Sequence, residues 1–390
     1  MTAPPHLDIP FHRGLHGDRD AAAVREVLRS GHTGGGGAIS ERVEARLRTV
    51  LASRHALLVT SCTHAMEACV MAMGVGPGDE VIVPGFLYVS LAAAVARQGA
   101  RPVFVDVEPV RLGLDPARVE EAIGPRTRAI FAVHYGGVPC RIDELLEIGA
   151  RRGIPVLEDA AQAIGSLGSG GRPLGSLGLA GCLSFHESKN VSCGEGGAIV
   201  TSDETLARRI ETIRDKGTNR AAAVRGEIPH YTWVSAGSSF TLSEIAAAVL
   251  ETQLAELEHI TRDRQRLMRR YAERLAPLAA RFDLVLPAPP AEGERWNGHI
   301  FALLLPARID RDAVVRAVRA RGVQLAAHFQ TLHDSPFMRS AWPGEPPALP
   351  VTARICAGIV RLPIYPSLTG AELDRVVDAL EQALAAADPR

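Results

Sequence analysis

The feature that most constrains the fold is an alternation of short apolar runs with helix-like segments between residues 55 and 201. The apolar runs are predicted to be buried strands, at residues 56–59, 81–83, 102–105, 129–133, 154–157, 182–185 and 198–201. Helix-like segments separate several of them, at 63–73, 90–98, 116–123 and 142–152. This order predicts an α/β fold with a large, mainly parallel sheet and helices on both of its faces.

The remaining chain predicts a smaller C-terminal α/β domain. An amphipathic pattern at 242–278 is followed by a strand-like run at 299–305 and helix-like segments at 310–321 and 370–386. We therefore expect a large domain over residues 1–250 and a small one over 251–390. Residues 34–37 are four glycines that lack the Lys-Ser/Thr ending of a phosphate-binding loop, so they are interpreted as a mobile loop near the entrance of a site.

Composition excludes several classes of function. The 43 Lys and Arg residues balance 44 Asp and Glu residues, which argues against a nucleic-acid partner. No run of about 18 apolar residues is present, and residues 1–12 lack a basic and then apolar leader, so we expect a cytoplasmic protein that does not bind membranes. The six cysteines form no CxxC pair, which predicts reduced thiols and no metal site.

Lysine is nearly absent from this chain. Only Lys189 and Lys216 are lysines, so the other 41 of the 43 basic residues are arginines. Arginine can supply a positive charge but not an amine nucleophile, because its guanidinium stays protonated. The two lysines are therefore candidates for chemistry, with chance survival of a rare residue as the alternative.

An acid and a lysine follow neighbouring predicted strands. Asp159 comes after the run 154–157, and Lys189 follows the run 182–185 and precedes a glycine-rich segment at 194–197. Pyridoxal phosphate (PLP) requires this pair: an amine that bonds its aldehyde, and a carboxylate that keeps its pyridine nitrogen protonated. The alternative for Asp159 is a helix N-cap.

Four further segments lie where such a cofactor needs them. Residues 60–64 (Thr-Ser-Cys-Thr-His) precede a predicted helix and offer hydroxyl and N–H groups to a phosphate. Tyr88 offers an aromatic face to the ring, although a lone tyrosine is more often packing. His134 and Tyr135 follow the fourth strand, and Ser239 lies in a segment that could donate hydroxyls to the phosphate.

These motifs together resemble a known family. Glu158-Asp159-Ala160-Ala161-Gln162, the run Ser184-Phe185-His186-Glu187-Ser188-Lys189-Asn190 and Gly194-Glu195-Gly196-Gly197 are similar to those of the DegT-type nucleotide-sugar aminotransferases, which are fold-type I PLP enzymes. The resemblance extends from Ile9 to Pro363. Residues 216–220 and 231–239 further resemble the dTDP-4-amino-4,6-dideoxygalactose transaminase subgroup and antibiotic-pathway sugar 4-aminotransferases.

The resemblance implies roles for individual residues. Lys189 would form the Schiff base with PLP, and Asp159 would hold the pyridinium nitrogen. Gln162 would lie against a ring substituent and Tyr88 would stack on the ring, while the phosphate would be held by Thr63, His64 and Ser184. Ser239 stands where many relatives have an asparagine that reaches the phosphate of the neighbouring subunit, so its contact is left open. The implied substrate-binding residues are His134, Tyr135, Asn190, Asn219, Arg220 and His328.

The implied reaction moves an amino group from glutamate, through the pyridoxamine form of the cofactor, to C4 of a dTDP-4-keto-6-deoxyhexose. The resemblance also implies a homodimer whose active sites lie between subunits, with Asn219 and Arg220 facing substrate across the interface. Lys216 is interpreted either as a contact to the substrate diphosphate or as a solvated side chain. The small-domain residues His299, His333, Arg361 and Tyr365 fall in segments on the substrate side, and each is interpreted as structural. Two alternative functions stay open: a 3-keto sugar nucleotide aminotransferase, and a non-catalytic PLP-binding regulatory or assembly protein.

Overall fold

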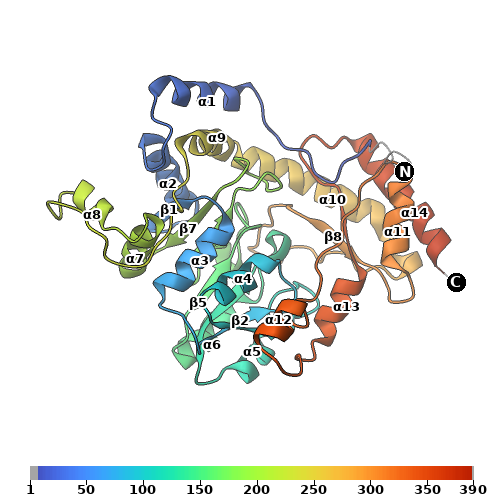
Figure 1. Ribbon diagram of the computed structural model, residues 1–390. Coiled ribbons are helices and arrows are strands. Elements are labelled where there is room, and N and C mark those ends of the chain that lie inside the picture. Colours follow the sequence, from blue (N-terminus) through green and yellow to red (C-terminus); the bar gives the residue numbers. More distant parts are fainter. Residues whose placement is uncertain (1–7, 389–390) are drawn as a thin grey trace.

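A seven-stranded sheet forms the centre of the protein, as Figure 1 shows for the computed structural model, which describes residues 8–388. Its strand order is β1-β7-β6-β5-β4-β2-β3, and all strands are parallel except β7, which is antiparallel to both of its neighbours. All seven predicted strands are present: β1 (His55–Val59), β2 (Glu80–Pro84), β3 (Arg101–Val105), β4 (Thr127–Val133), β5 (Val156–Asp159), β6 (Gly181–Ser184) and β7 (Gly197–Thr201). The predicted α/β class is confirmed.

Helices cover both faces of this sheet, because successive side chains of each strand point to opposite faces. In β4, Phe131 packs into the core beneath α3 (Cys62–Ala72), α4 (Val89–Arg97) and α7 (Glu204–Arg214). The adjacent Ile130 and Ala132 pack on the other face beneath α5 (Pro116–Ala122) and α6 (Ile142–Arg152). The strands are therefore buried on both sides, which explains their continuous apolar sequences.

Two N-terminal helices, α1 (Asp18–Ser30) and α2 (Ala38–Val50), pack against α9 (Glu244–Ala255). Of the four glycines expected to form a mobile loop, Gly35 and Gly37 lie close to residues at the start of α9, whereas Gly34 and Gly36 are exposed. A Cβ on Gly35 would lie 2.1 Å from the carbonyl oxygen of Leu242, so only glycine fits there. The Glu244 carboxylate accepts hydrogen bonds from the N–H groups of Gly37, Ile39 and Ser40 and thereby caps α2.

A smaller C-terminal unit is built on the two-stranded antiparallel sheet of β8 (Phe301–Leu304) and β9 (Ile359–Leu362). The helices α10 (Leu257–Phe282), α11 (Arg311–Arg319) and α14 (Gly370–Ala387) enclose its core, which also takes in Ile9 from the N-terminal segment. Two short helices, α12 (Pro336–Ala341) and α13 (Pro350–Gly358), lie between α11 and β9. The expected domain boundary at residue 250 falls inside α9, and a division there remains an expectation.

A buried aspartate joins the two units. Asp106 follows β3, and its Oδ1 accepts hydrogen bonds from the backbone N–H of Thr352 at 2.8 Å and from its hydroxyl at 2.7 Å. Its Oδ2 accepts from the N–H of Val351 at 3.0 Å. Asp106 therefore caps the first turn of α13 from the large unit and fixes the small unit against the sheet.

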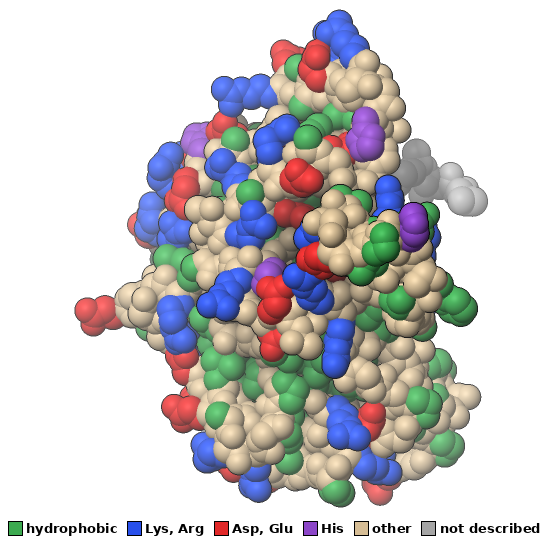
Figure 2. Space-filling model, turned by 90° about the vertical axis from the view of Figure 1, so that its left-hand side faces the viewer, with side chains coloured by type: hydrophobic (Ala, Val, Ile, Leu, Met, Phe, Trp, Pro, Cys, Tyr) green, Lys and Arg blue, Asp and Glu red, His purple; other side chains and the backbone are tan. Residues whose placement is uncertain are grey.

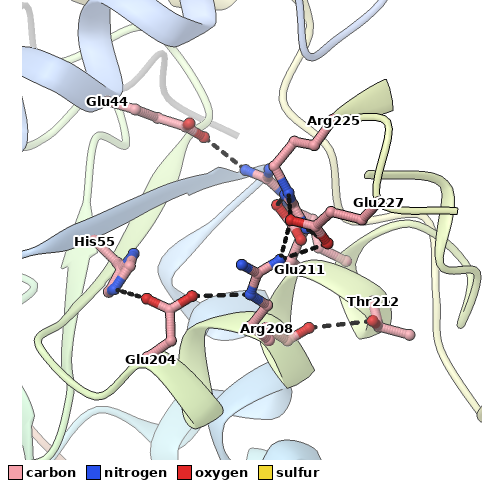
Figure 3. A network of polar contacts seen from close by, with 9 residues as sticks. Glu44, His55, Glu204, Arg208, Glu211, Thr212, Arg225 and Glu227 are labelled. Atoms are coloured by element: carbon pink, nitrogen blue, oxygen red, sulfur yellow. Dashed lines mark hydrogen bonds and ion pairs between the residues drawn. The ribbon is translucent and has the colours of Figure 1, made fainter. Parts of the chain in front are cut away.

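The residues between α7 and α9 form an arm that projects from the body and carries the short helix α8 (Arg220–Val224) (Figure 1). An ionic network holds the base of this arm (Figure 3). Arg208 contacts Glu204 and Glu227, and Arg225 contacts Glu211 and Glu227, all four pairs at 2.7 to 2.9 Å. Positive and negative side chains alternate over this side of the molecule (Figure 2), as the near-zero net charge predicts.

None of the helices between residues 8 and 388 is long and apolar enough to span a membrane. Over the same residues, no group of His, Cys, Asp and Glu side chains is arranged to hold a metal ion. The expectation that residues 1–12 form no leader falls partly on residues 1–7, which lie outside the described residues.

Candidate active site

A cavity of about 480 Å³ lies at the carboxyl ends of β4, β5 and β6, the position expected for a ligand in such a sheet. Its walls come from the large unit and from four side chains of the small unit, His299, His328, Phe329 and Arg361. Nine of the residues expected at the site line this cavity together: Thr63, Tyr88, His134, Tyr135, Asp159, Gln162, Ser184, Lys189 and His328.

Lys189 reaches the cavity from the loop of the β6–β7 hairpin. Its backbone N–H donates to the carbonyl of His186 at 2.9 Å, which closes a tight turn. Its ammonium has no hydrogen-bond acceptor among the described side chains, and burial lowers its pKa. By contrast, Lys216 is exposed and pairs with Asp215 at 2.7 Å. Lys189 is therefore the lysine placed to act as an amine.

Asp159 is the last residue of β5, between Val133 of β4 and Cys182 of β6. Its Oδ1 accepts a hydrogen bond from the N–H of Ala161 at 3.0 Å, and no described residue hydrogen-bonds its Oδ2. Burial raises the pKa of Asp159, while the Ala161 N–H and the Lys189 ammonium oppose that rise. A cationic ring nitrogen in the cavity would favour the ionised carboxylate further.

Two helix N-termini meet at one end of the cavity. Ser61 caps α3 by accepting from the N–H of His64 at 3.1 Å, and Thr63 donates its hydroxyl to Ser90 in the first turn of α4 at 2.9 Å. A Cβ on Gly197 would lie 2.4 Å from the backbone of Ser61, so the glycine lets β7 approach this turn. Hydroxyl groups beside helix N-termini form a suitable site for a phosphate.

His64 and Ser239 do not line the cavity. The Nδ1 atom of His64 lies 2.5 Å from the Thr60 hydroxyl, and its ring stacks on Phe240 at 4.5 Å. Ser239 precedes Phe240 and pairs with Asp215 at the base of the arm. Within one chain, neither the His64 nor the Ser239 side chain is therefore placed to contact a phosphate bound in this cavity.

The side chains of Gln162 and Tyr88 differ in how firmly the protein holds them. The Gln162 side chain is fixed, because its Oε1 accepts from the N–H of Gly136 at 2.6 Å. Tyr88 is 61% exposed, and its nearest aromatic neighbour, Phe329, is 6.0 Å away between ring centres. The Tyr88 ring is therefore free to stack on a ligand.

Two buried polar pairs support the cavity wall. Glu158 lies 2.9 Å from Nε2 of His134 and accepts from the N–H groups of Gly175, Leu177 and Gly178 at 2.6 to 2.7 Å. Burial alone would raise the pKa of Glu158, but His134 and these N–H groups lower it, so the carboxylate stays ionised.

In the second pair, the Asn190 side chain lies 2.9 Å from Nδ1 of His299. Asn190 is buried and does not line the cavity. It instead holds His299 in place behind Lys189.

Asn219 and Arg220 lie on the arm, away from the cavity of their own chain. The Oδ1 atom of Asn219 accepts from the N–H of Thr232 at 2.7 Å and so pins the arm's two segments together. Arg220 lies 3.9 Å from Asp215. Neither residue reaches a ligand within one chain.

The residues present fit PLP. The unpaired Lys189 amine, the free oxygen of Asp159 and the two helix N-termini surround one cavity, and they match the aldehyde, the ring nitrogen and the phosphate of that cofactor. The fold and this site define a fold-type I PLP-dependent aminotransferase. Residues 15–381 match the DegT/DnrJ/EryC1/StrS aminotransferase family, and the chain belongs to this family. It is a PLP-dependent sugar aminotransferase.

Solved structures agree with this assignment. DesV of S. venezuelae is 34% identical, with 94% of each chain covered and a TM-score of 0.84. The aminotransferase TlmJ of Streptoalloteichus hindustanus is 30% identical over 97% of this chain and 99% of that one, with a TM-score of 0.87. An aminotransferase from Psychrobacter cryohalolentis is 26% identical over 97% of this chain and 100% of that one, with a TM-score of 0.90.

Several residues of the site were not predicted from the sequence. Glu158 was predicted only as a member of the Glu158–Gln162 motif, with no role of its own, although the period-two alternation of a strand places it on the face opposite Asp159. Ser90 could have been identified from the sequence, because it is a hydroxyl residue at the start of a predicted helix. No sequence pattern could have identified Phe11 and Phe329, because they reach the cavity only through contacts between residues distant in sequence.

Proposed function

We propose that the protein transfers the amino group of glutamate to C4 of a dTDP-4-keto-6-deoxyhexose, which gives a dTDP-4-amino-4,6-dideoxy sugar. The observation that carries this proposal is the single cavity in which the Lys189 amine and the Asp159 carboxylate accompany a phosphate-binding end. Bound PLP supplies an electron sink for the bonds at the donor's α-carbon. Membership of the sugar aminotransferase family supports a sugar acceptor.

Lys189 and Asp159 have separate tasks in this reaction. The lowered pKa of Lys189 increases the neutral fraction of its amine, which can then remove the proton from the donor's α-carbon and later deliver one to the sugar carbon. Asp159 keeps a proton on the ring nitrogen of the cofactor. Tyr135 and His328, on the side of the cavity beneath the small unit, are positioned to orient the sugar.

The proposed enzyme acts as a homodimer in which the arm reaches a second copy of the chain. Tyr231 and Trp233 on the arm are 58% and 75% exposed, and Val224 and Val234 beside them are exposed too. Apolar surface of this kind is typical of an interface. It would bring Asn219 and Arg220 toward the partner's cavity.

Incubation with dTDP-4-keto-6-deoxyglucose and glutamate, followed by NMR of the product, tests the assignment. An amino group at C4 is the expected result, and the spectrum also reports whether it is axial or equatorial. The same incubation with a 3-keto isomer tests the alternative. If only that isomer is converted, to a product with an amino group at C3, the 3-keto alternative replaces this proposal.

A matched pair of lysine variants tests the assigned amine. We expect Lys189→Ala to lose amino transfer and the absorbance change that glutamate causes in the bound cofactor, whereas Lys216→Ala retains both. Substantial turnover by Lys189→Ala would refute the role given to Lys189.

A further inference from the structure

His299 presents an unused hydrogen-bonding nitrogen to the active-site cavity. Its side chain is buried and lines the cavity just before β8. The Nδ1 atom lies 2.9 Å from Oδ1 of Asn190, whereas no described residue hydrogen-bonds the Nε2 atom. Asn190 does not line the cavity, so the Nδ1 edge of the ring faces the protein. Nε2 is therefore the nitrogen that is left for a ligand.

The amide of Asn190 determines which nitrogen of the imidazole carries the proton. Its Nδ2 atom donates to the carbonyl oxygen of Asn297 at 3.1 Å, so its Oδ1 atom is the one that faces His299. An amide oxygen can only accept a hydrogen bond, and Nδ1 of His299 must therefore be the donor. In a neutral imidazole the other nitrogen then has a free lone pair. Nε2 is consequently a hydrogen-bond acceptor.

Asn297 fixes the direction of this acceptor. Its Oδ1 atom accepts from the backbone N–H of His299 at 3.0 Å. Its Nδ2 atom donates to the carbonyl oxygens of Gln162 and Ile164 at 2.8 and 2.9 Å. An imidazole turned over within this frame would face Asn190 with a carbon atom and would lose its hydrogen bond. The ring is therefore held in one orientation, with Nε2 toward the cavity.

The surroundings of the ring keep it uncharged. Burial lowers the pKa of His299 well below 6.5, and nearby positive charges lower it further: those of Lys189, Arg264, Arg361 and His12. No carboxylate of the described chain is in ion-pair contact with the ring to oppose this shift. At neutral pH, Nε2 can therefore accept a hydrogen bond but cannot donate one.

The place of His299 beside Lys189 indicates which donor it meets. Asn190 follows Lys189 in the chain and holds the His299 ring, and both Lys189 and His299 line the same cavity. In the proposed reaction, Lys189 acts at C4 of the sugar. The neighbouring carbons are C3, which carries a hydroxyl, and C5, which carries the ring oxygen and a methyl group. The 3-hydroxyl is therefore the only hydrogen-bond donor next to the reacting carbon.

We propose that Nε2 of His299, held in one direction by Asn190 and Asn297, accepts a hydrogen bond from the 3-hydroxyl of the sugar and so selects sugars that carry a hydroxyl at C3. This inference rests on the proposed function and adds a specificity-determining residue to it. Asn190 and Asn297 act as positioning residues, because they fix the tautomer and the orientation of the ring.

Binding of an unreactive sugar nucleotide tests the proposal without turnover. dTDP-6-deoxyglucose has a hydroxyl in place of the 4-keto group, and its 3-deoxy-3-fluoro analogue has a fluorine that donates no hydrogen bond. Titration calorimetry of the cofactor-loaded protein would compare the two ligands. We expect the wild type to prefer the 3-hydroxyl ligand at least about 5-fold, which is the scale of one net hydrogen bond. His299→Leu should lose this preference, and His299→Gln should keep part of it because its amide oxygen can accept.

His55→Leu is the matched control. It removes an imidazole on β1 that pairs with Glu204 at 3.0 Å and does not line the cavity, so it should keep the wild-type preference. Circular dichroism and cofactor absorbance would show whether each variant is folded and loaded, and His299→Gln provides the comparison if His299→Leu is not. Equal affinities of the wild type for the two ligands, or an undiminished preference in His299→Leu, would overturn the proposal.

Nitrogen-15 NMR of the histidine-labelled protein tests the tautomer directly, with the His299 signals assigned by their loss in His299→Gln. We expect a protonated Nδ1 and an unprotonated Nε2 in the wild type at about pH 7. In Asn190→Leu, where Nδ1 loses its acceptor, the form with a protonated Nε2 should become populated. A protonated Nε2 in the wild type would contradict the proposal, because it could not accept from a hydroxyl.

These measurements separate the inference from the proposed function. A wild type that aminates only a 3-keto sugar would refute the proposed function, and calorimetry would still decide whether His299 binds the 3-hydroxyl. Amination at C4 together with equal affinities for the two ligands would refute the role of His299 and leave the proposed function standing.

Discussion

At the scale of single residues, the site depends on how burial changes ionisable groups. Lys189 and Asp159 line one cavity, where burial lowers the pKa of the amine and raises that of the carboxyl group. Both shifts favour the neutral forms when no ligand is present. The aldehyde of the cofactor reacts with the neutral amine of Lys189. Its cationic ring nitrogen, in contrast, needs the ionised carboxylate of Asp159.

Asp159→Asn should keep part of the cofactor but lose about 10³-fold or more in turnover, because an amide cannot hold the ring nitrogen protonated. Cofactor absorbance and product formation measure the two effects separately. Near-normal rates in this variant would show that another group performs the task.

Acid should destabilise the protein through buried histidines. Burial, with help from Lys189 and nearby arginines, lowers the pKa of His299 far below 6.5 and that of His328 to about 2. The folded state therefore binds fewer protons than the unfolded state, and this stabilisation is complete above about pH 6.5 and declines as the pH falls. The pKa of His134 is raised instead, so its contribution to the stability of the folded state is already complete below pH 6.5.

Thermal unfolding at pH 6.5 and pH 5.5 measures this effect. We expect the Tm to fall with pH in the wild type, and to fall less in His299→Gln. The exposed His230 on the arm is the control position, and His230→Gln should keep the wild-type dependence. Equal slopes for all three proteins would contradict the explanation.

At the scale of helices and strands, capping by distant carboxylates fixes the architecture. Glu244 caps α2 across more than 200 residues of sequence, and Asp106 caps α13 in the same way. Since α13 leads into β9, the cap at Asp106 also determines where Arg361 lies.

Asp106→Ala should lower the free energy of unfolding by about 2–4 kcal/mol, because it removes a buried cap and leaves the N–H of Thr352 without its acceptor. Asp106→Asn keeps one acceptor oxygen and should lose less. Urea denaturation measures both, and a loss below about 0.5 kcal/mol in Asp106→Ala would show that α13 is held by other contacts.

The sequence predicted those elements whose signals are local. The seven strands, Lys189 and Asp159 were found because short apolar runs and scarce chemistry-bearing residues can be recognised without partners. β9 was missed because four residues directly after a helix give little periodic signal. The contact of Phe11 with Arg361 joins residues 350 positions apart in the chain, which no local pattern can indicate.

At the scale of the whole molecule, the arm between α7 and α9 is the part whose surface suits another protein chain. Its aromatic residues are exposed, while the ionic network at its base holds it in a defined position (Figure 3). A preformed arm loses little conformational entropy on binding.

Sedimentation of the protein should show a dimer, and Trp233→Asp with Tyr231→Asp should weaken association at least 10-fold by placing charges in an apolar contact. The matched control is Val285→Asp, at an exposed apolar position on the small unit. An unchanged dimer in the arm variant would place the interface elsewhere.

The near-absence of lysine also makes the chain convenient to label. An amine-reactive dye would find one accessible side chain in the folded, cofactor-loaded protein, Lys216, besides the terminal amine. Fluorescence from the dye on Lys216, at the base of the arm, would follow subunit exchange in solution without introducing a cysteine.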